Sequence, residues 1–182
     1  DVAALTKYRL VGFNNRNYDN HILYARMMGY SISQLYHLSA RLTNPSKQVQ
    51  QSAKFANAYH LSYTDIYDFL SDKKSLKKLE IQLGIPHVEL GLDWNKEVPE
   101  ELFEKVAEYC DNDVLATEAV FDSGFGQADF LARQIIAKIS GLSCNHSTNR
   151  HSEKIIFGDN KNPQVEFIYP NLADEFPGYK FE

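Results

Sequence analysis

A short apolar segment that passes through a polar turn into a helix constrains the fold of this chain most strongly. Residues 8–13 (YRLVGF) are aromatic and aliphatic, and they predict a buried β-strand. Residues 14–17 (NNRN) are turn formers. A helix is predicted from about residue 19 to residue 28 and ends at Gly29, because glycine favours the position after a helix. Its side chains at helical spacing are Ile22, Leu23, Arg26 and Met27.

The next part of the chain repeats the alternation of strand and helix. Residues 40–57 are polar with weak periodicity and predict a loop or a marginal helix on the surface. Residues 59–66 predict a second strand. Residues 75–83 predict an amphipathic helix on Leu76, Leu79 and Leu83, which Gly84 and Pro86 end. Strands that alternate with helices indicate the α/β class.

Two longer helices are predicted after this segment. The longest opens near Pro99, with glutamates in its first turn, and continues through Phe121. A further helix is predicted over residues 127–140, and Gly141 ends it. The predicted apolar stripes are Leu102, Val106, Cys110 and Val114, with Phe103 and Leu115 beside them, in the first helix, and Phe130, Leu131, Ile135 and Ile139 in the second. From residue 142 the sequence becomes polar, which predicts a domain over residues 1–141 and a connector over residues 142–182.

Composition limits the classes of function. A length of 182 residues suits one domain with an extension. The formal net charge of −5 argues against a protein that coats nucleic acid, because that mode needs many Lys and Arg contacts to phosphate. It leaves a metal-dependent nuclease open, since carboxylates that hold Mg²⁺ make such a site acidic. Two cysteines and the lack of a long apolar run predict a protein of a reducing cytoplasm, without a membrane span.

Two polar motifs carry the chemistry. The first is Asn14-x-x-x-Tyr18-Asp19, which follows the first predicted strand, and the second is Tyr109-x-x-x-Asp113 on the longest helix. Residues four apart on a helix lie about 40° apart around the axis, so Tyr109 and Asp113 share a face. Carboxylates such as Asp19 and Asp113 are ligands for Mg²⁺ or Mn²⁺, and a phenol can orient a water molecule.

Each motif alone has a simpler interpretation. Asp19 could cap a helix, and residues 14–17 could form an ordinary turn. A Tyr-x-x-x-Asp pair is common on the solvated face of a helix. The order of the two motifs, with the first in a strand-turn-helix unit and the second on a helix, favours a shared nuclease site.

Both motifs resemble those of the DEDD-type 3′ to 5′ exonucleases of the RNase H-like fold, in the subclass with Tyr in the third motif. GFNNRNYDNHIL is similar to their second motif and EYCDNDVLATEAVF to their third, especially in the proofreading domains of phage-type DNA polymerases. The resemblance implies a mixed sheet flanked by helices. It implies that Asp19 and Asp113 are metal ligands in a two-metal site, that Tyr109 orients the water, and that Asn14 and Tyr18 bind substrate.

The same resemblance implies a single-stranded DNA 3′ end as substrate and a polymerase domain as partner, in cis or in trans, in a bacterium or a phage-infected host. The family's first motif, Asp-x-Glu on a strand, has no match before Asn14. We therefore expect an incomplete metal site and a sheet that lacks its first strands. A free-standing DEDD nuclease acting on DNA or RNA and a non-catalytic nucleic-acid-binding module on the same scaffold are the alternatives.

Overall fold

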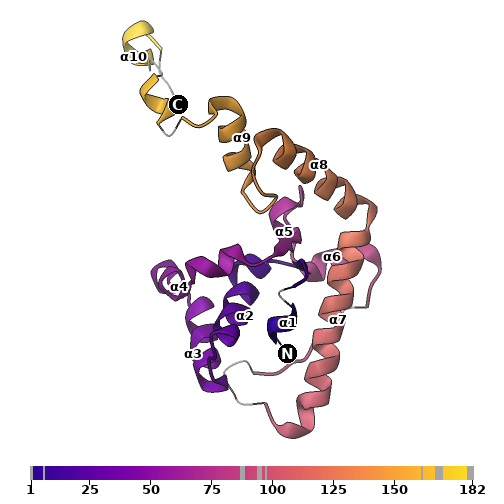
Figure 1. Cartoon of the computed structure of the whole chain (residues 1–182). Helices are drawn as coiled ribbons and strands as arrows, with labels where there is room; N and C mark the ends of the chain where they lie inside the picture. The colour runs from indigo at the N-terminus through magenta and orange to yellow at the C-terminus, as the bar shows by residue number, and fades with distance from the viewer. Residues whose placement is uncertain are drawn as a thin grey trace.

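The computed structural model describes residues 2–5, 7–86, 89–93, 96, 98–160, 162–166 and 170–179. Within these ranges the chain is rich in helices and has one small sheet (Figure 1). Strand β1 (Leu10–Gly12) pairs in parallel with β2 (Tyr63–Asp65), with Leu10 opposite Tyr63. A parallel pair needs a crossover connection, and the helices between the two strands provide it. The expected α/β class is therefore present, with a sheet of two strands among the described residues.

The sheet differs from the prediction in size and burial. The described residues form a two-stranded parallel sheet, and the predicted mixed sheet is not seen among them. All three residues of β2 are buried, whereas Val11 in the middle of β1 is 43% exposed and Tyr8 is 69% exposed. The prediction of a buried first strand was therefore wrong in part. The physical reason is that Val11 lines a cavity and packs into neither core cluster of the described residues.

Helices fill the connection between the strands. They are η1 (Asn15–Asn17), α2 (Asp19–Met27), α3 (Ile32–Leu42), α4 (Lys47–Ala53) and η2 (Ala56–His60). Ser31 and Gln34 form a capping box that starts α3, a helix that the sequence analysis left out. Residues 40–57, predicted as a loop or marginal helix, contain the end of α3 and all of α4. Ala25, Leu38, Leu42 and Ala53 form the core of this region.

Helix α2 has the predicted extent but buries a different face. It begins at Asp19 and is followed by Gly29 at a φ of 88°. Tyr18 occupies the N-cap position, and Asp19 is the first helical residue, so the capping interpretation of Asp19 was wrong. The buried residues are Asn20, His21 and Ala25, while Met27 is 40% exposed. The apolar pattern missed this face because His21 packs on the rings of Phe55 and Tyr59.

A second core joins β2 to the long helices. It contains Ile66, Phe69, Leu70, Leu79 and Val120. The elements around it are α5 (Ile66–Phe69), α6 (Leu76–Leu83), η3 (Glu100–Leu102), α7 (Phe103–Asp122) and α8 (Gly124–Ser140). Helix α6 is as predicted, with Gly84 after it at a φ of 71°. Pro99 caps η3 rather than filling its first helical position.

The apolar stripes predicted for α7 and α8 were wrong in large part, although Phe130 packs on the core and Leu102 and Val106 are half-buried. Val114 is 66% exposed and Ile139 is 66% exposed. In α7 the buried residues are Ala116 and Val120, and in α8 they are Gly126, Arg133, Ala137 and Ser140. Ala116, Gly126 and Ala137 are small, so the helices can pack closely at these positions without long apolar side chains. Buried Arg133 fulfils its hydrogen bonds with backbone carbonyls, so a polarity pattern does not reveal the inner face of α8.

The predicted connector contains helix α9 (Thr148–Phe157), followed by η4 (Pro163–Glu166) and α10 (Leu172–Glu175). Helix α9 packs on α8 and buries His151, whose Nδ1 lies 2.8 Å from the Ser140 hydroxyl. The chain begins with α1 (Val2–Leu5), which lies beside α2 (Figure 1). No helix in the described part is both long enough and apolar enough to cross a membrane. Cys110 and Cys144 are free thiols.

Candidate functional site

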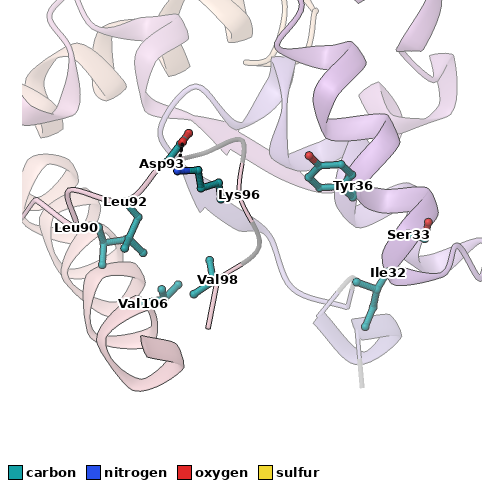
Figure 2. Close-up of a pocket in the computed structure, with 9 residues that line it drawn as sticks. All are labelled: Ile32, Ser33, Tyr36, Leu90, Leu92, Asp93, Lys96, Val98 and Val106. Carbon is teal, nitrogen blue, oxygen red and sulfur yellow. Dashed lines mark ion pairs between the residues drawn. The ribbon is translucent and has the colours of Figure 1, made fainter. Parts of the chain in front are cut away.

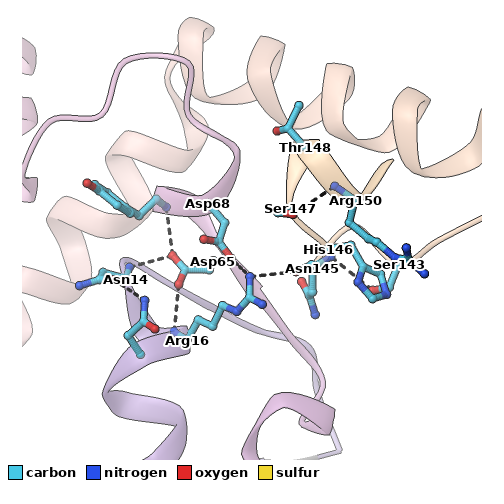
Figure 3. A network of polar contacts seen from close by, with 12 residues as sticks. Asn14, Arg16, Asp65, Asp68, Ser143, Asn145, His146, Ser147, Thr148 and Arg150 are labelled. Carbon is cyan, nitrogen blue, oxygen red and sulfur yellow. Dashed lines mark hydrogen bonds and ion pairs between the residues drawn. The ribbon is translucent and has the colours of Figure 1, made fainter. Parts of the chain in front are cut away.

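The turn after β1 is held by a carboxylate from the end of β2. Asp65 accepts hydrogen bonds from the backbone N–H groups of Asn14 at 2.8 Å, Arg16 at 2.9 Å and Tyr67 at 3.0 Å (Figure 3). Asn14 has a φ of 58° and is the one non-glycine residue with a positive φ among the described residues. Asparagine tolerates this left-handed conformation better than most residues. Asp65 thus fixes the geometry of the first motif.

Asp65 was missed by the sequence analysis. It is 3% exposed, and burial raises the pKa of its carboxyl, with a further contribution from the charge of Asp68. A usable signal existed, because Asp65 lies between a strand and a helix, where Asp is a favoured N-cap, and it does cap α5.

Asp19 and Asp113 line the same cavity. This cavity has a volume of 650 Å³, and its walls come from β1, the start of α2, α6 and α7. Asp19 is exposed when the whole residue is considered. Protein atoms nevertheless surround its carboxyl, and this burial raises the pKa of the carboxyl. The negative charge of Asp65 raises it further. The predicted convergence of the two motifs on one cleft is therefore present.

Tyr109 and Asp113 share a face of α7, as their spacing predicted. Both line an adjoining cavity of 490 Å³. The pKa of Tyr109 is raised, first by burial and then by the charge of Asp113 and a hydrogen bond to it. Glu80, which is 1% exposed on α6, lines this cavity too and adds to the shift. The phenol is consequently protonated at neutral pH and can donate a hydrogen bond.

Asn14 and Tyr18 lie on the other side of Asp19. They line a third cavity, of 570 Å³, to which Asp19 also contributes. The Tyr18 hydroxyl is 2.7 Å from that of Ser39 on α3. The 650 Å³ cavity shares Asp19 with this third cavity and Asp113 with the Tyr109 cavity, so the five predicted site residues line three cavities with wall residues in common.

A fourth, apolar cavity has a volume of 540 Å³ (Figure 2). It shares Leu90 and Leu92 with the Tyr109 cavity. Ile32 and Tyr36 of α3 form one side of it, and Val106 of α7 lies on the other. Its charged residues are Asp93 and Lys96, which form an ion pair at 3.5 Å.

A polar network joins the first motif to the region before α9 (Figure 3). The Arg16 guanidinium donates to the Asp68 carboxylate at 3.0 Å and to the Asn145 carbonyl at 3.2 Å. Arg133 donates to the Asp68 carbonyl at 2.9 Å and also to the carbonyl of His146. This network holds the turn of the first motif against α5 and against the segment before α9. Its role is structural.

Asp19 and Asp113 are the candidate ligands for a metal ion. Asp19 and Asp113 offer hard carboxylate oxygens, which Mg²⁺ and Mn²⁺ prefer. No group of three His, Cys, Asp or Glu residues in the described ranges lies close enough to hold one ion. Asp19 and Asp113 are therefore the two candidate ligands that the described residues bring to one cavity.

Comparison with protein families places the motifs in context. The model of one family, described as a predicted 3′-5′ exonuclease related to the exonuclease domain of PolB, matches residues 2–124. This range covers more than half of the chain and includes both motifs. Comparison with curated proteins gave no significant match, and comparison with solved structures gave none either.

Proposed function

Since the chain belongs to the family of predicted 3′-5′ exonucleases related to the exonuclease domain of PolB, we propose that it trims single-stranded DNA from the 3′ end. We assign it to proofreading, with a polymerase domain as partner in cis or in trans. The observation that carries the proposal is the cavity that Asp19 and Asp113 share. Asp19 and Asp113 are 94 positions apart in the sequence. An ordinary turn and an ordinary solvated helix face would not be expected to line the same cavity.

Each motif residue has a role in this proposal. Asp19 and Asp113 supply oxygen ligands to Mg²⁺ or Mn²⁺, in the two-metal arrangement of related nucleases. The bound metal would supply positive charge for the scissile phosphate and acidify a water molecule. Tyr109 stays protonated and directs its hydroxyl toward the Asp113 side of the cavity. Its proton is donated to Asp113, and the phenol oxygen can accept a hydrogen bond from the attacking water.

Asn14 and Tyr18 form the substrate side of the proposed site. Both line the cavity that adjoins Asp19, and the backbone of Asn14 is fixed by Asp65. A fixed turn keeps the Asn14 amide in one place for the incoming strand, which lowers the cost of ordering it on binding. We further propose an RNase H-like fold, for which the parallel β1–β2 pair and its helical crossover provide support.

A nuclease assay on this chain tests the proposal. A 5′-labelled single strand should shorten in steps from its 3′ end in excess Mn²⁺, and a 3′-phosphorylated strand should resist. Asp113→Ala should remove the shortening. Glu101→Ala is the matched control, because Glu101 is an exposed carboxylate on η3 that lines none of these three cavities. It should retain most of the activity.

The outcomes separate the alternatives. A wild-type chain that binds DNA but never shortens it would favour the non-catalytic binding module. Equal shortening by wild-type and Asp113→Ala protein would contradict the assigned site.

A further inference from the structure

The segment between Asp19 and Asp65 contains no carboxylate. The chain has 24 Asp and Glu residues in total, yet none lies at positions 20–64. The cationic residues of this segment are Arg26, Arg41, Lys47 and Lys54. Acidic residues are therefore distributed unevenly along the chain, although its net charge is −5. A surface that has cationic and no acidic side chains attracts negatively charged ligands.

This acid-free segment faces an acid-rich helix across the site. It forms α2, α3 and α4, which lie opposite α7 in the fold (Figure 1). The acidic residues of α7 are Glu104, Glu108, Asp111, Asp113, Glu118 and Asp122, against a single cation, Lys105. Asp113, Glu118 and Asp122 line the cavity shared with Asp19. A chain of phosphates is attracted to the first wall and repelled by the second.

Lys54 is the cation that lies next to Asp19. It lines the 570 Å³ cavity, and no other cation of the described residues lines that cavity, whereas Lys77 lines the cavity of Tyr109. Its ammonium donates to the Asn17 side-chain oxygen at 3.0 Å, and the Asn17 amide donates to the Asn14 side-chain oxygen at 3.3 Å. Lys54 is thus positioned by the first motif. An ammonium has three donors, and the bond to Asn17 uses one of them.

Neutral polar groups complete this cavity. Asn14, Asn17, Thr43 and Gln50 contribute amides and a hydroxyl, and Asp19 is its one acid. Gln50 is held by its bond to the Asn44 carbonyl at 2.6 Å, which fixes α4 against the end of α3. Amide and ammonium donors around one cavity match the oxygens of a phosphodiester.

We propose that this cavity binds a backbone phosphate of single-stranded DNA on the 5′ side of the scissile linkage, with Lys54 as its charged ligand. The strand then follows the acid-free wall of α2–α4 toward Asp19 and Asp113, and its 3′ end stops at the acidic wall of α7. The choice of ligand rests on the proposed function. The position of the phosphate rests on the charge distribution and on the cavity.

DNA binding in EDTA tests this site separately from hydrolysis. Lys54→Ala should weaken binding of a 5′-labelled single strand about fivefold at low salt and lower the salt slope by about 0.7, the value for one phosphate contact. Lys54→Arg should restore most of the affinity. Lys138→Ala on α8 makes the same change in net charge away from the cavity, and it should bind like wild type. Thermal unfolding of each variant confirms that it is folded.

A scan of the DNA locates the contact. One linkage at a time is replaced by an uncharged methylphosphonate. A linkage on the 5′ side of the terminal one should weaken binding to wild-type protein but not to Lys54→Ala protein. Unchanged binding by Lys54→Ala, an equal loss with Lys138→Ala, or the same sensitive linkage in both proteins would overturn the proposal. If Lys54-dependent binding is found but no trimming occurs in Mn²⁺, the exonuclease proposal fails and the phosphate site stands.

Discussion

The backbone N–H of Asn14 donates a hydrogen bond of 2.8 Å to the carboxylate of Asp65, which lies 51 positions later in the sequence. The first motif therefore depends on the second strand for its shape. The same carboxylate accepts from Arg16 and Tyr67, so one buried side chain fixes both the turn before α2 and the start of α5.

Loss of the Asp65 carboxylate should destabilise the fold. Asp65→Ala leaves three backbone N–H groups without this acceptor, and we expect a loss of about 2 kcal/mol or more in the free energy of unfolding. Asp65→Asn should cost less, because one acceptor oxygen remains. Urea unfolding measures both. Asp72→Asn is the control, since Asp72 is an exposed partner of Lys74, and it should change stability by less than about 0.5 kcal/mol. Equal stability of wild type and Asp65→Ala would refute the structural role.

The pKa of Asp19 should lie above its ordinary value of 3.8. Burial in the cavity is the main cause, and the charge of Asp65 adds to it. An NMR titration of the Asp carboxyl carbons measures this pKa directly. Asp65→Asn should lower it, because one negative charge is removed. A midpoint at or below 3.8 in the wild-type chain would contradict the described environment.

The same shift predicts the sign of a stability change. A carboxyl whose pKa is raised in the folded state favours folding when it is protonated, below pH 3.8. This contribution is lost as the pH rises through the folded pKa. At pH 7 the ionised Asp19 therefore opposes folding, and Asp19→Asn should be at least as stable as wild type. Paired thermal unfolding curves at pH 7 check this, and a clearly less stable Asp19→Asn variant would be the opposite result.

Acid should weaken the contact between α8 and α9 through His151. Burial lowers the pKa of His151 below 6.5, and the nearby charges of Arg133 and His146 lower it further. The Ser140 hydroxyl lies 2.8 Å from His151 Nδ1 and 3.1 Å from the Ala137 carbonyl, and the buried Nε2 of His151 has no hydrogen-bond partner among the described residues. A lowered pKa gives stability that is complete above pH 6.5 and is lost as the pH falls toward the folded pKa.

Urea unfolding at several pH values from 7.5 downward measures this effect. Wild-type stability should fall below pH 6.5, and His151→Gln should reduce the slope. His37→Gln is the control, because His37 is exposed on α3. An unchanged slope in His151→Gln would show that another group is responsible, such as His21, whose pKa is also lowered by burial.

Mn²⁺ should bind weakly to this 182-residue chain. Two carboxylates cannot neutralise two divalent ions, and no group of three His, Cys, Asp or Glu residues in the described ranges lies close enough to hold one ion. Isothermal titration should give one weak site that Asp113→Ala removes. Tight binding of two ions by the wild-type chain would contradict this expectation.

Sequence was sufficient where a local rule decides the structure. Gly84 marks the end of α6, because the left-handed conformation after a helix favours glycine. Tyr109 and Asp113 share a face because the helical repeat fixes it. The order and context of the two motifs predicted a shared cleft, and Asp19 and Asp113 line one cavity.

Sequence was insufficient where tertiary packing decides. The exposed faces of α7 and α8 contain long apolar residues such as Val114 and Ile135, while Ala116 and Arg133 are buried. Polarity alone therefore indicated the wrong faces. Asp65 and Lys54 were missed because their partners, Asn14 and Asn17, lie far away in sequence. Such long-range hydrogen bonds leave no periodic pattern.

The most direct test of a single site built from both motifs is a double-mutant cycle on 3′-end trimming in excess Mn²⁺. Asp19→Ala and Asp113→Ala should each reduce the rate by about 10³-fold or more, and the double variant should lose little more, because residues that act as a unit are not additive. Full activity in either single variant, or a double loss equal to the product of the two single losses, would contradict a shared site.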